Sequence, residues 1–484
     1  MSAPLWTVDA LVAAMRAERA GTLPATIGGI SIDSRSISPD QAFFAIKGDT
    51  HDGHAFVAAA LDNGAGLAVV AHDKRDGMPG GAPLLIVPDV LDGLRDLAAA
   101  ARARSRGKIV AVTGSVGKTS TKEALRLALA RDGEVHASVA SFNNHWGVPL
   151  SLARLPATAR YGVFEIGMNH AGEITPLTKL VRPDVAIITT IAPVHLEFFR
   201  SVEEIADAKA EIFLGMAPGG AAVLNRDNAQ FDRLARAAAE AGVERIVGFG
   251  EHAEADARLV RCALQPDAST VEADILGHRV AYKIGAPGKH LVVNSLAVLA
   301  AAHLAGADLA LAALALADQA PAAGRGTRIE LDVPGGSALL IDESYNANPL
   351  SMRAAFALLG QAPIGPRGRR IAVLGDMLEL GAAGADLHRE LAGSIRENGI
   401  DLVFCAGPLM AALWEALPSA CRGGYAKDAA TLEPEVVAAV RGGDAVMVKG
   451  SFGSRMGGIV KALSRRYAAP AAPEPMQARV QAQG

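Results

Sequence analysis

One segment near residue 110 joins an apolar strand, a glycine-containing turn and a helix that begins with Lys-Thr. Residues 109–113 are apolar or β-branched, which is typical of a buried strand. The chain turns at Gly114 and Gly117, and residues 118–129 carry apolar side chains at helical spacing. Backbone N–H groups of such a turn can surround phosphate oxygens, and the helix N-terminus adds positive potential. The segment therefore predicts a phosphate-binding loop between a strand and a helix.

Lys118 and Thr119 give this loop the side chains that phosphate chemistry uses. The Lys118 ammonium can reach the β- and γ-phosphates, and the Thr119 hydroxyl can bind Mg²⁺. The full Walker pattern has a glycine at the position of Val112, so the loop departs from that of ordinary GTPases. The other loop residues expected to contact ATP are Gly114, Ser115, Val116, Gly117 and Ser120.

Composition and charge exclude several classes of protein. The chain has 484 residues and a formal net charge of −4, which implies no general attraction to nucleic acid or anionic membranes. Its three cysteines are scattered, which indicates neither a disulfide framework nor a structural zinc site. Residues 1–9 do not read as a signal peptide. Residues 291–317 are Ala-rich but contain polar side chains, so a buried helix pair is favoured over membrane insertion. We expect a soluble cytoplasmic enzyme.

Alternating apolar and helical segments predict an α/β protein of three domains. Residues 1–106 are expected to form a small N-terminal α/β domain. Residues 107–322 are expected to form the central P-loop ATPase domain, with a mostly parallel sheet covered by helices on both faces. Residues 323–467 predict a second parallel, Rossmann-like α/β domain, and residues 468–484, rich in Ala, Pro and Gln, predict a disordered tail.

Several polar side chains follow strands of the predicted central sheet, at the edge where parallel sheets bind ligands. Glu165 ends one strand, and a carboxylate there is costly to bury unless it is paired or bound to metal. We interpret it as a Walker-B-like magnesium ligand. His195 follows the next strand, although a lone histidine is more often structural. Asn143 and Asn144 lie in a polar loop, and Lys209 lies on a predicted helix, where a solvated surface lysine is the alternative.

These motifs resemble those of the Mur ligase family over roughly residues 30–465. The loop Thr-Gly-x-x-Gly-Lys-Thr at 113–119 is similar to that of Mur ligases and folylpolyglutamate synthetases, and Glu-Ile-Gly-Met-Asn-His at 165–170 resembles a second family pattern. The most specific segment is Asp-Glu-Ser-Tyr-Asn-Ala-Asn-Pro at 342–349, in which a Glu stands where the family usually has a second Asp. Gly-Asp-Met-Leu-Glu-Leu-Gly at 375–381 resembles the same family.

The resemblance implies roles for residues before position 210. Ser34, Arg35, Phe43, Lys47 and Gly48 are implied to hold the uridine nucleotide of the substrate, and Asn143 and Asn144 to line the substrate site. The residues implied to be catalytic are Lys118, Glu165, His195 and Lys209. The implied magnesium ligands are Thr119, Glu165, His195 and Lys209, the last after it has taken up CO₂ as a carbamate.

The resemblance also implies contacts to ATP further along the chain. They fall on Asn294, Arg325, Tyr345, Asn346, Asn348 and Asp376. Arg325 is implied to reach the γ-phosphate, and Asp376 to contact either the ATP ribose or the incoming dipeptide. The segment Lys-Gly-Ser at 449–451 resembles a family motif whose backbone amides can hold a terminal carboxylate. One departure is Leu291, which stands where the family has Asn, so a role for His290 stays open.

The implied reaction joins D-alanyl-D-alanine to a UDP-N-acetylmuramoyl tripeptide, with ATP and Mg²⁺, through an acyl phosphate. We expect a monomer. The nearest rival is the ligase that adds the third amino acid, but its Asp-Asn-Pro-Arg signature is absent from this chain. Folylpolyglutamate synthetase is disfavoured by the Asp-Ser-Arg segment at 33–35, and a bare P-loop ATPase stays open as a third alternative. The third residue of the tripeptide, diaminopimelate or lysine, also stays open.

Overall fold

The computed structural model describes residues 4–48, 51–139 and 141–468, so the predicted disordered tail lies outside the described residues except for Ala468. The chain divides into two compact units, here called unit 1, which ends at Ala320, and unit 2, which begins at Pro321. None of the described helices has the length and apolar character needed to cross a membrane. The boundaries between the three predicted domains stay predictions.

Unit 1 begins with a five-stranded sheet in the order β2-β7-β6-β5-β4. Its strands pair in parallel, except that β2 runs antiparallel to β7. A two-stranded ribbon, β1-β3, precedes it. The strands are β1 (Trp6–Thr7), β2 (Glu18–Ala20), β3 (Thr26–Ile27), β4 (Gly29–Ser31), β5 (Gln41–Phe44), β6 (Leu67–Ala71) and β7 (Leu84–Val87). The helical segments are α1 (Val8–Met15), η1 (Gly53–Phe56), α2 (Val57–Asp62), η2 (His72–Gly77) and α3 (Val90–Arg104).

The second sheet of unit 1 is nine-stranded, in the order β16-β15-β14-β13-β12-β11-β8-β10-β9. Its strands are β8 (Lys108–Thr113), β9 (Val135–Ala137), β10 (Tyr161–Glu165), β11 (Val185–Ile188), β12 (Ala221–Asn225), β13 (Arg245–Gly250), β14 (Ala257–Leu264), β15 (Ser269–Ile275) and β16 (His278–Ile284). Its helical segments are α4 (Lys118–Ala130), α5 (Gly147–Ala153), α6 (Ile174–Val181), α7 (Val202–Ala210), η3 (Glu211–Gly215), α8 (Phe231–Glu240), α9 (Lys289–Leu304), α10 (Leu309–Ala315) and η4 (Leu316–Asp318).

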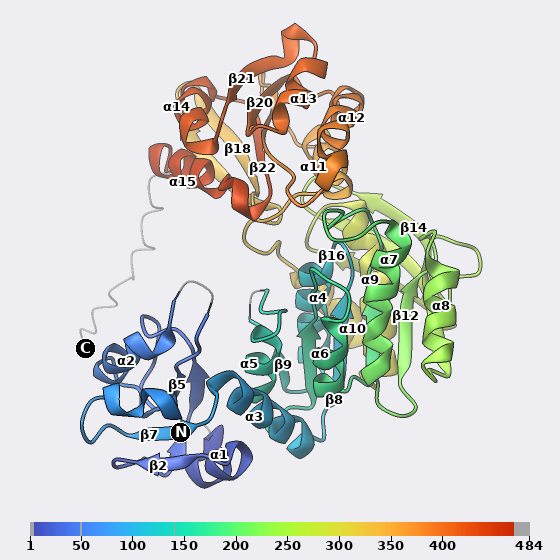
Figure 1. The fold of residues 1–484 in the computed structure, drawn as a ribbon. Helices are drawn as coiled ribbons and strands as arrows, with labels where there is room; N and C mark the ends of the chain where they lie inside the picture. Colours follow the sequence, from blue (N-terminus) through green and yellow to red (C-terminus); the bar gives the residue numbers. More distant parts are fainter. Residues whose placement is uncertain (1–3, 49–50, 140, 469–484) are drawn as a thin grey trace, which may run out of the picture. The chain divides into compact units, whose positions relative to one another are not determined.

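Helices cover both faces of this sheet, as the sequence predicted (Figure 1). Along β8, Val110 and Val112 face one apolar core together with α4 and α9, whereas Ile109 and Ala111 face the other. This alternation follows from the two-residue period of a strand. The two helices expected over residues 291–317 are present as α9 and α10, but only α9 is buried along most of its length, because α10 exposes Leu311 and Leu314.

The prediction of a mostly parallel sheet missed its antiparallel end. β14, β15 and β16 pair antiparallel, whereas β8 to β14 pair in parallel. Exposed polar side chains alternate with buried ones along β15 and β16 because one side of this edge faces solvent. Such strands lack the continuous apolar runs that identified the buried parallel strands.

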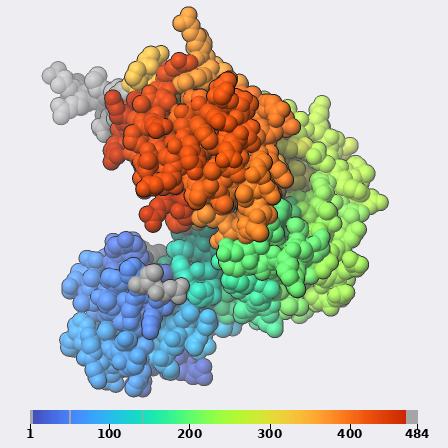
Figure 2. Space-filling view, turned by 45° about the horizontal axis from the view of Figure 1, so that its top comes forward, coloured from blue at the N-terminus to red at the C-terminus, as the bar shows by residue number. Residues whose placement is uncertain are grey.

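Helix α3 lies between the two sheets of unit 1 and packs on α1, α5 and α6 (Figure 1). Its apolar face belongs to a single core that includes Phe44 of the first sheet and Ile109 of the second. Trp6 fixes the N-terminal end of this core: its indole Nε1 donates to Ala153 O at 2.9 Å, and the Arg104 guanidinium carbon lies 3.3 Å from its ring centroid. Figure 2 shows the blue N-terminal part in continuous contact with the teal part of the same unit.

Unit 2 contains a six-stranded sheet in the order β17-β18-β22-β19-β20-β21, in which β17 alone runs antiparallel to its neighbour. The strands are β17 (Thr327–Val333), β18 (Gly336–Glu343), β19 (Arg370–Gly375), β20 (Leu402–Ala406), β21 (Arg422–Ala426) and β22 (Ala445–Lys449). The helical segments are α11 (Pro349–Gly360), η5 (Gly381–Ala383), α12 (Gly384–Glu397), α13 (Met410–Ala416), η6 (Ser419–Cys421), α14 (Ala429–Ala439), η7 (Phe452–Ser454) and α15 (Gly457–Arg466). The α/β class predicted from the sequence is confirmed in both units.

Replacing Trp6 by alanine tests the shared core of unit 1. Trp6 is 4% exposed, and removing a buried aromatic side chain typically lowers the free energy of unfolding by about 3–5 kcal/mol. Leu314→Ala on α10 is the control, because Leu314 is 69% exposed and its loss should change stability by about 0.5 kcal/mol or less. Denaturant unfolding followed by circular dichroism measures both values. Equal effects of the two substitutions would contradict the assignment of Trp6 to the core.

Candidate active site

The phosphate-binding loop predicted from the sequence connects β8 to α4. Gly114 has a φ of +144° and Gly117 a φ of +87°, values that favour glycine. Space is also restricted at both positions. A Cβ at Gly114 would overlap Thr189 Oγ1, and a Cβ at Gly117 would lie 2.5 Å from Asn294 Nδ2. Both glycines are therefore required by backbone conformation and by close neighbours, and one of these neighbours is Asn294, a predicted ATP contact.

The segment after β11 holds the loop from the other side. Thr189 Oγ1 donates to Val116 O at 2.6 Å, and Ser115 N donates to Thr190 O at 2.8 Å. Ala192 N in turn donates to Ser115 Oγ at 3.0 Å. Thr189 and Thr190 were not among the predicted site residues. Both threonines directly follow a buried strand of the central sheet, and this position could have identified them as site residues.

Glu165 is the buried carboxylate of the site and is 1% exposed. Thr119 Oγ1 donates to its Oε2 at 2.9 Å, and Asn143 Nδ2 donates to its Oε1 at 2.7 Å. Ser141 Oγ lies 3.3 Å from Thr119 Oγ1. The fold therefore brings together three residues that are far apart in the sequence, Thr119, Asn143 and Glu165. Both side chains that donate to the buried carboxylate are neutral.

Two lysines lie close enough to influence each other. Lys118 Nζ donates to Gly114 O at 2.7 Å, within the phosphate-binding loop. Lys209, at the end of α7, is 1% exposed. Burial lowers the pKa of Lys209 well below its usual range, and the positive charge of Lys118 lowers it further. Lys209 is thus not the solvated surface lysine that its sequence context alone allowed.

Glu211 connects the Lys209 segment to the segment that follows Glu165. Its carboxylate accepts hydrogen bonds from the N–H of Gly172 at 2.5 Å and from the N–H and hydroxyl of Thr175 at 2.9 Å each. Thr175 lies in the first turn of α6, where a carboxylate is favoured by unpaired backbone N–H groups. No role was predicted for Glu211 from the sequence, because its contact between α7 and α6 depends on the tertiary structure.

His195 lies three residues after Ala192, whose backbone contacts the phosphate-binding loop. It is half-buried and adopts a φ of +55°, which is uncommon for a residue other than glycine. Among the described residues, no three His, Cys, Asp or Glu side chains are grouped as metal ligands. The predicted magnesium ligands include only one carboxylate, Glu165, and one histidine, His195. The other two predicted ligands are the Thr119 hydroxyl and Lys209.

The residues predicted to bind the uridine nucleotide differ in exposure. Arg35 is exposed and binds the Asp33 carboxylate with Nε at 2.9 Å and Nη2 at 2.8 Å, which lowers the pKa of Asp33 to about 2. Phe43 is 1% exposed and packs in the core of the first sheet, so its side chain stabilises that sheet. Of the remaining predicted contacts, Ser34 is buried, and Lys47 and Gly48 are exposed.

Unit 2 presents a group of aromatic and cationic side chains near the end of β18. The Arg325 guanidinium carbon lies 4.4 Å from the Tyr345 ring centroid, and the Phe452 ring centroid lies 5.9 Å from it. Phe452 is 75% exposed. We call Arg325, Tyr345 and Phe452 the aromatic shelf. Arg325 and Tyr345 are predicted ATP contacts, whereas no role was predicted for Phe452.

Three further predicted ATP contacts have structural partners within unit 2. Asn348 caps α11, with its side chain accepting from Ser351 N at 2.9 Å. The Asn346 side chain accepts from the next backbone N–H at 2.8 Å. Asp376 is buried, which raises its carboxyl pKa, and it accepts from Met410 N at 2.9 Å. These side chains shape the carboxyl end of the sheet, and their contacts with ATP stay predictions.

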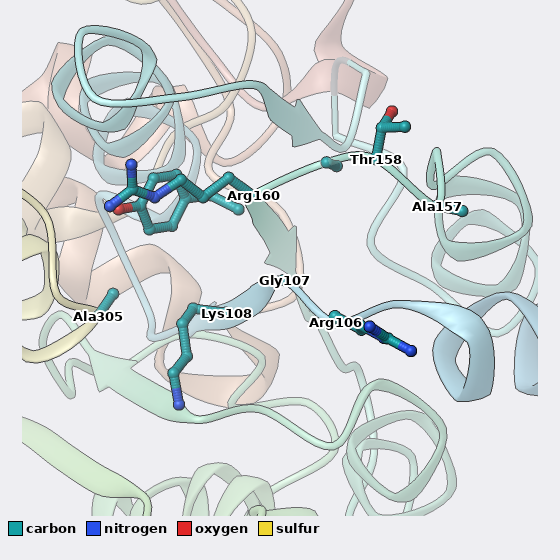
Figure 3. Close-up of a pocket in the computed structure, with 9 residues that line it drawn as sticks. Arg106, Gly107, Lys108, Ala157, Thr158, Arg160 and Ala305 are labelled. Carbon is teal, nitrogen blue, oxygen red and sulfur yellow. The ribbon is translucent and has the colours of Figure 1, made fainter. Parts of the chain in front are cut away.

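The opposite edge of the central sheet carries an open pocket lined by Lys108, Tyr161 and their neighbours. Three cations border it, but Arg106, Lys108 and Arg160 point in different directions (Figure 3). Lys108 pairs with Asp184 at 3.0 Å, and Arg160 pairs with Asp132 at 2.9 Å. Because the cations diverge and two are neutralised, we do not assign this pocket a ligand.

Comparison with protein families matches three consecutive segments of the chain to Mur ligase models. Residues 26–102 match the Mur ligase family, catalytic domain, and residues 112–302 match the Mur ligase middle domain. Residues 324–452 match the Mur ligase, glutamate ligase domain. The chain is also 31% identical to the UDP-N-acetylmuramoyl-tripeptide–D-alanyl-D-alanine ligase of Rickettsia prowazekii, over 89% of this chain and 94% of the relative.

Solved structures give the same result. MurF from Acinetobacter baumannii superimposes with a TM-score of 0.80 at 30% identity, covering 96% of this chain and 100% of that structure. The MurF ligase from Thermotoga maritima in complex with ADP gives a TM-score of 0.73 at 25% identity, covering 90% of this chain and 97% of that structure.

The close contact at Gly117 can be measured with a glycine pair of matched conformation. Gly117→Ala and Gly242→Ala both place a Cβ at a similar positive φ, +87° and +82°, which typically costs about 1–2 kcal/mol. Only Gly117 has Asn294 beside it, so Gly117→Ala should lower the free energy of unfolding more than Gly242→Ala. Adding Asn294→Ala should remove the excess. Equal losses for the two single variants in denaturant unfolding would show that the contact is unimportant.

Proposed function

The chain belongs to the Mur ligase family, and we propose that it joins D-alanyl-D-alanine to UDP-N-acetylmuramoyl tripeptide, using ATP, to form the pentapeptide precursor of peptidoglycan. The observation that carries this assignment is the match, over nearly the whole chain, to relatives and solved structures of that ligase. The Tyr-Asn-Ala-Asn-Pro turn after β18 supports it over the ligase that adds the third amino acid, because the Asp-Asn-Pro-Arg signature of that enzyme is absent.

The chemistry proceeds through an acyl phosphate. A carboxylate is a poor electrophile, so the terminal carboxylate of the tripeptide first attacks the γ-phosphorus of ATP and ADP leaves. The amine of D-alanyl-D-alanine then attacks the acyl carbon, and phosphate leaves from the tetrahedral intermediate. In this proposal Lys118, already anchored on Gly114 O, stabilises negative charge on the transferred phosphoryl group. The loop N–H groups hold the remaining phosphates.

The donor set at Glu165 fits a magnesium ion. It offers one buried carboxylate and the Thr119 hydroxyl, oxygen donors of the kind that Mg²⁺ prefers. Mg²⁺, when bound, supplies positive charge that neutralises the phosphate oxygens during transfer. The two neutral donors on Glu165 keep its carboxylate oriented, and Thr119 stands at the first turn of the loop helix, next to Lys118. His195 and Lys209 complete the proposed ligand set.

The environment of Lys209 favours its carbamylation. Only a neutral amine reacts with CO₂, and burial lowers the pKa of Lys209 well below its usual range. In the reaction the Nζ lone pair of the neutral amine forms the N–C bond and one proton is released, so a neutral group becomes an anion; starting from the ammonium ion, two protons leave in all. The carbamate would attract Lys118, whereas the ammonium ion repels it. It would also give the proposed magnesium site a second carboxylate-like ligand beside Glu165. We propose that carbamylated Lys209 is the working form of the enzyme.

The remaining predicted contacts form part of the same proposal. We assign Ser34, Arg35, Lys47 and Gly48 to the uridine diphosphate group. Arg35 is exposed, so its guanidinium can release the Asp33 carboxylate and bind a phosphate instead. We assign Tyr345 and Phe452 of the aromatic shelf to the adenosine of ATP, and Arg325 of the same shelf to the γ-phosphate. The substrates are nucleotides and ATP, so we place the reaction in the cytoplasm. A monomer stays a prediction.

The decisive experiment measures phosphate release from ATP and Mg²⁺ with the UDP-linked tripeptide, with and without D-alanyl-D-alanine, followed by mass spectrometry of the product. Separate reactions with the diaminopimelate and lysine tripeptides identify the accepted substrate. We expect release that depends on both substrates and a product heavier by one dipeptide. Release that ignores the dipeptide would support a bare ATPase, and extension by another amino acid would support a rival ligase.

Variants of two glutamates test the role of Glu165 in the same assay. Glu165→Gln removes the buried charge and should lower kcat by about 10²-fold or more, as is typical when a charge-stabilising group is lost. Glu203→Gln is the control, because Glu203 is exposed on α7. It should leave kcat unchanged. Full activity of Glu165→Gln at saturating Mg²⁺ would remove Glu165 from the proposed metal site.

Carbamylation of Lys209 has a direct spectroscopic test. With ¹³C-labelled bicarbonate, we expect one protein carbamate resonance in the NMR spectrum. Because protonation of the amine prevents its reaction, the resonance should weaken as the pH falls through the lowered pKa of Lys209 and persist above it. Lys209→Met should abolish the resonance, whereas Lys179→Met, at an exposed position on α6, should preserve it. A resonance that survives Lys209→Met would assign the carbamate elsewhere.

A further inference from the structure

We propose that Lys449 is the positioning residue that holds the adenosine-binding turn of unit 2, an inference that rests on the proposed function. Lys449 is the last residue of β22 and is only 2% exposed. Its Nζ lies 3.0 Å from Glu343 Oε2. Glu343 is the last residue of the neighbouring parallel strand β18, and the two residues are direct partners in the strand register. The strands therefore end in one ion pair, in which Lys449 is buried and Glu343 is partly buried.

The same ammonium also reaches the turn that follows β18. Lys449 Nζ donates to Asn346 O at 3.0 Å, so it holds a backbone atom in the middle of the Tyr-Asn-Ala-Asn-Pro segment. The far end of that segment is fixed by Asn348, which caps α11. Between the strand and the helix, Lys449 is therefore the side chain that joins the start of the turn, at Glu343, to its centre.

The turn determines where the aromatic shelf stands. Tyr345 lies between Glu343 and Asn346, the two residues that Lys449 binds. The backbone N–H of Tyr345 donates to Gly324 O at 3.1 Å, and its ring contacts Arg325 and Phe452. Because Lys449 contacts none of the shelf side chains in the described hydrogen bonds and ring contacts, its effect on adenosine must pass through the position of the turn.

Ser451 also connects the loops at the carboxyl end of the sheet in unit 2. Ser451, two residues after Lys449, has its Oγ 3.4 Å from Ala347 O and accepts from Leu378 N at 2.9 Å. Ser451 N donates to Asp376 O at 3.0 Å. The segment after β22 thus holds both the turn after β18 and the loop after β19. Lys449 supplies the charged part of this arrangement.

Two effects of removing Lys449 must be separated by experiment. Lys449→Met leaves Glu343 without its partner, and a partly buried carboxylate without a partner destabilises a fold. It also releases Asn346 O and with it the turn. The double variant Lys449→Met/Glu343→Gln removes the unpaired charge but does not restore the hold on Asn346. Stability and nucleotide affinity should therefore respond differently to the second substitution.

The experiment uses the full chain and measures ADP affinity by titration calorimetry, thermal stability, and the KM values for ATP and D-alanyl-D-alanine. For Lys449→Met we expect a lower melting temperature, a loss of ADP affinity and a rise in KM for ATP of about tenfold or more each, with kcat and the KM for the dipeptide changed by less than about threefold. The double variant should regain stability and keep the weak ADP affinity. Arg353→Met, which breaks the exposed Arg353–Glu390 pair of the same unit, should change neither.

Three outcomes would overturn the proposal. The first is ADP affinity that is unchanged in Lys449→Met. The second is a double variant that regains ADP affinity together with stability, because the loss would then come from the unpaired Glu343. The third is a rise in the KM for the dipeptide instead of ATP, which would make Lys449 a substrate contact. A failure of the proposed function is distinguishable, since the wild-type chain would then lack dipeptide-dependent phosphate release.

Discussion

The buried carboxylate of Glu165 is the constraint on which the candidate site depends. Glu165 is 1% exposed, and burying a charged carboxylate is costly unless other groups compensate for the lost water. Two neutral hydrogen-bond donors do so here: Thr119 on α4 and Asn143 in the loop between β9 and α5. The carboxylate therefore organises three chain segments around itself. Lys209 is equally buried, and burial together with the positive charge of Lys118 lowers its pKa well below the usual range. A site of this kind is built to accept positive charge.

Much of the fold and part of the site could be predicted because their signals are local. The buried strands of the central sheet, such as Lys108–Thr113, are continuous apolar runs, and the loop glycines and Lys-Thr pair follow directly in the sequence. Since parallel strands end at one edge, Glu165 and the phosphate-binding loop were expected to be neighbours before any contact was known. The geometry of Thr119 and Glu165 agrees with that expectation.

Other features depend on contacts that no short pattern contains. Glu211 looks like an ordinary helical glutamate until α6 is placed beside it. Phe43, proposed from a motif to meet substrate, has its side chain in a core because both faces of β5 are covered, and its contact with substrate stays a prediction. Asn348 reads equally well as a ligand contact or as a helix cap; the structure shows that it forms the cap, and its contact with ATP stays a prediction. The antiparallel end of the central sheet was missed because its strands are half-exposed.

The continuous apolar core across unit 1 has a consequence for how the chain unfolds. Helix α3 buries one surface on the first sheet and α1, and another on α5 and α6, so neither sheet has a complete core without it. Elements that share a core tend to open together, as a single cooperative unit. A fragment ending at residue 106 would expose the face of α3 that α5 normally covers. The N-terminal segment is thus a separate part of the architecture, yet its stability is inseparable from that of the sheet that follows it.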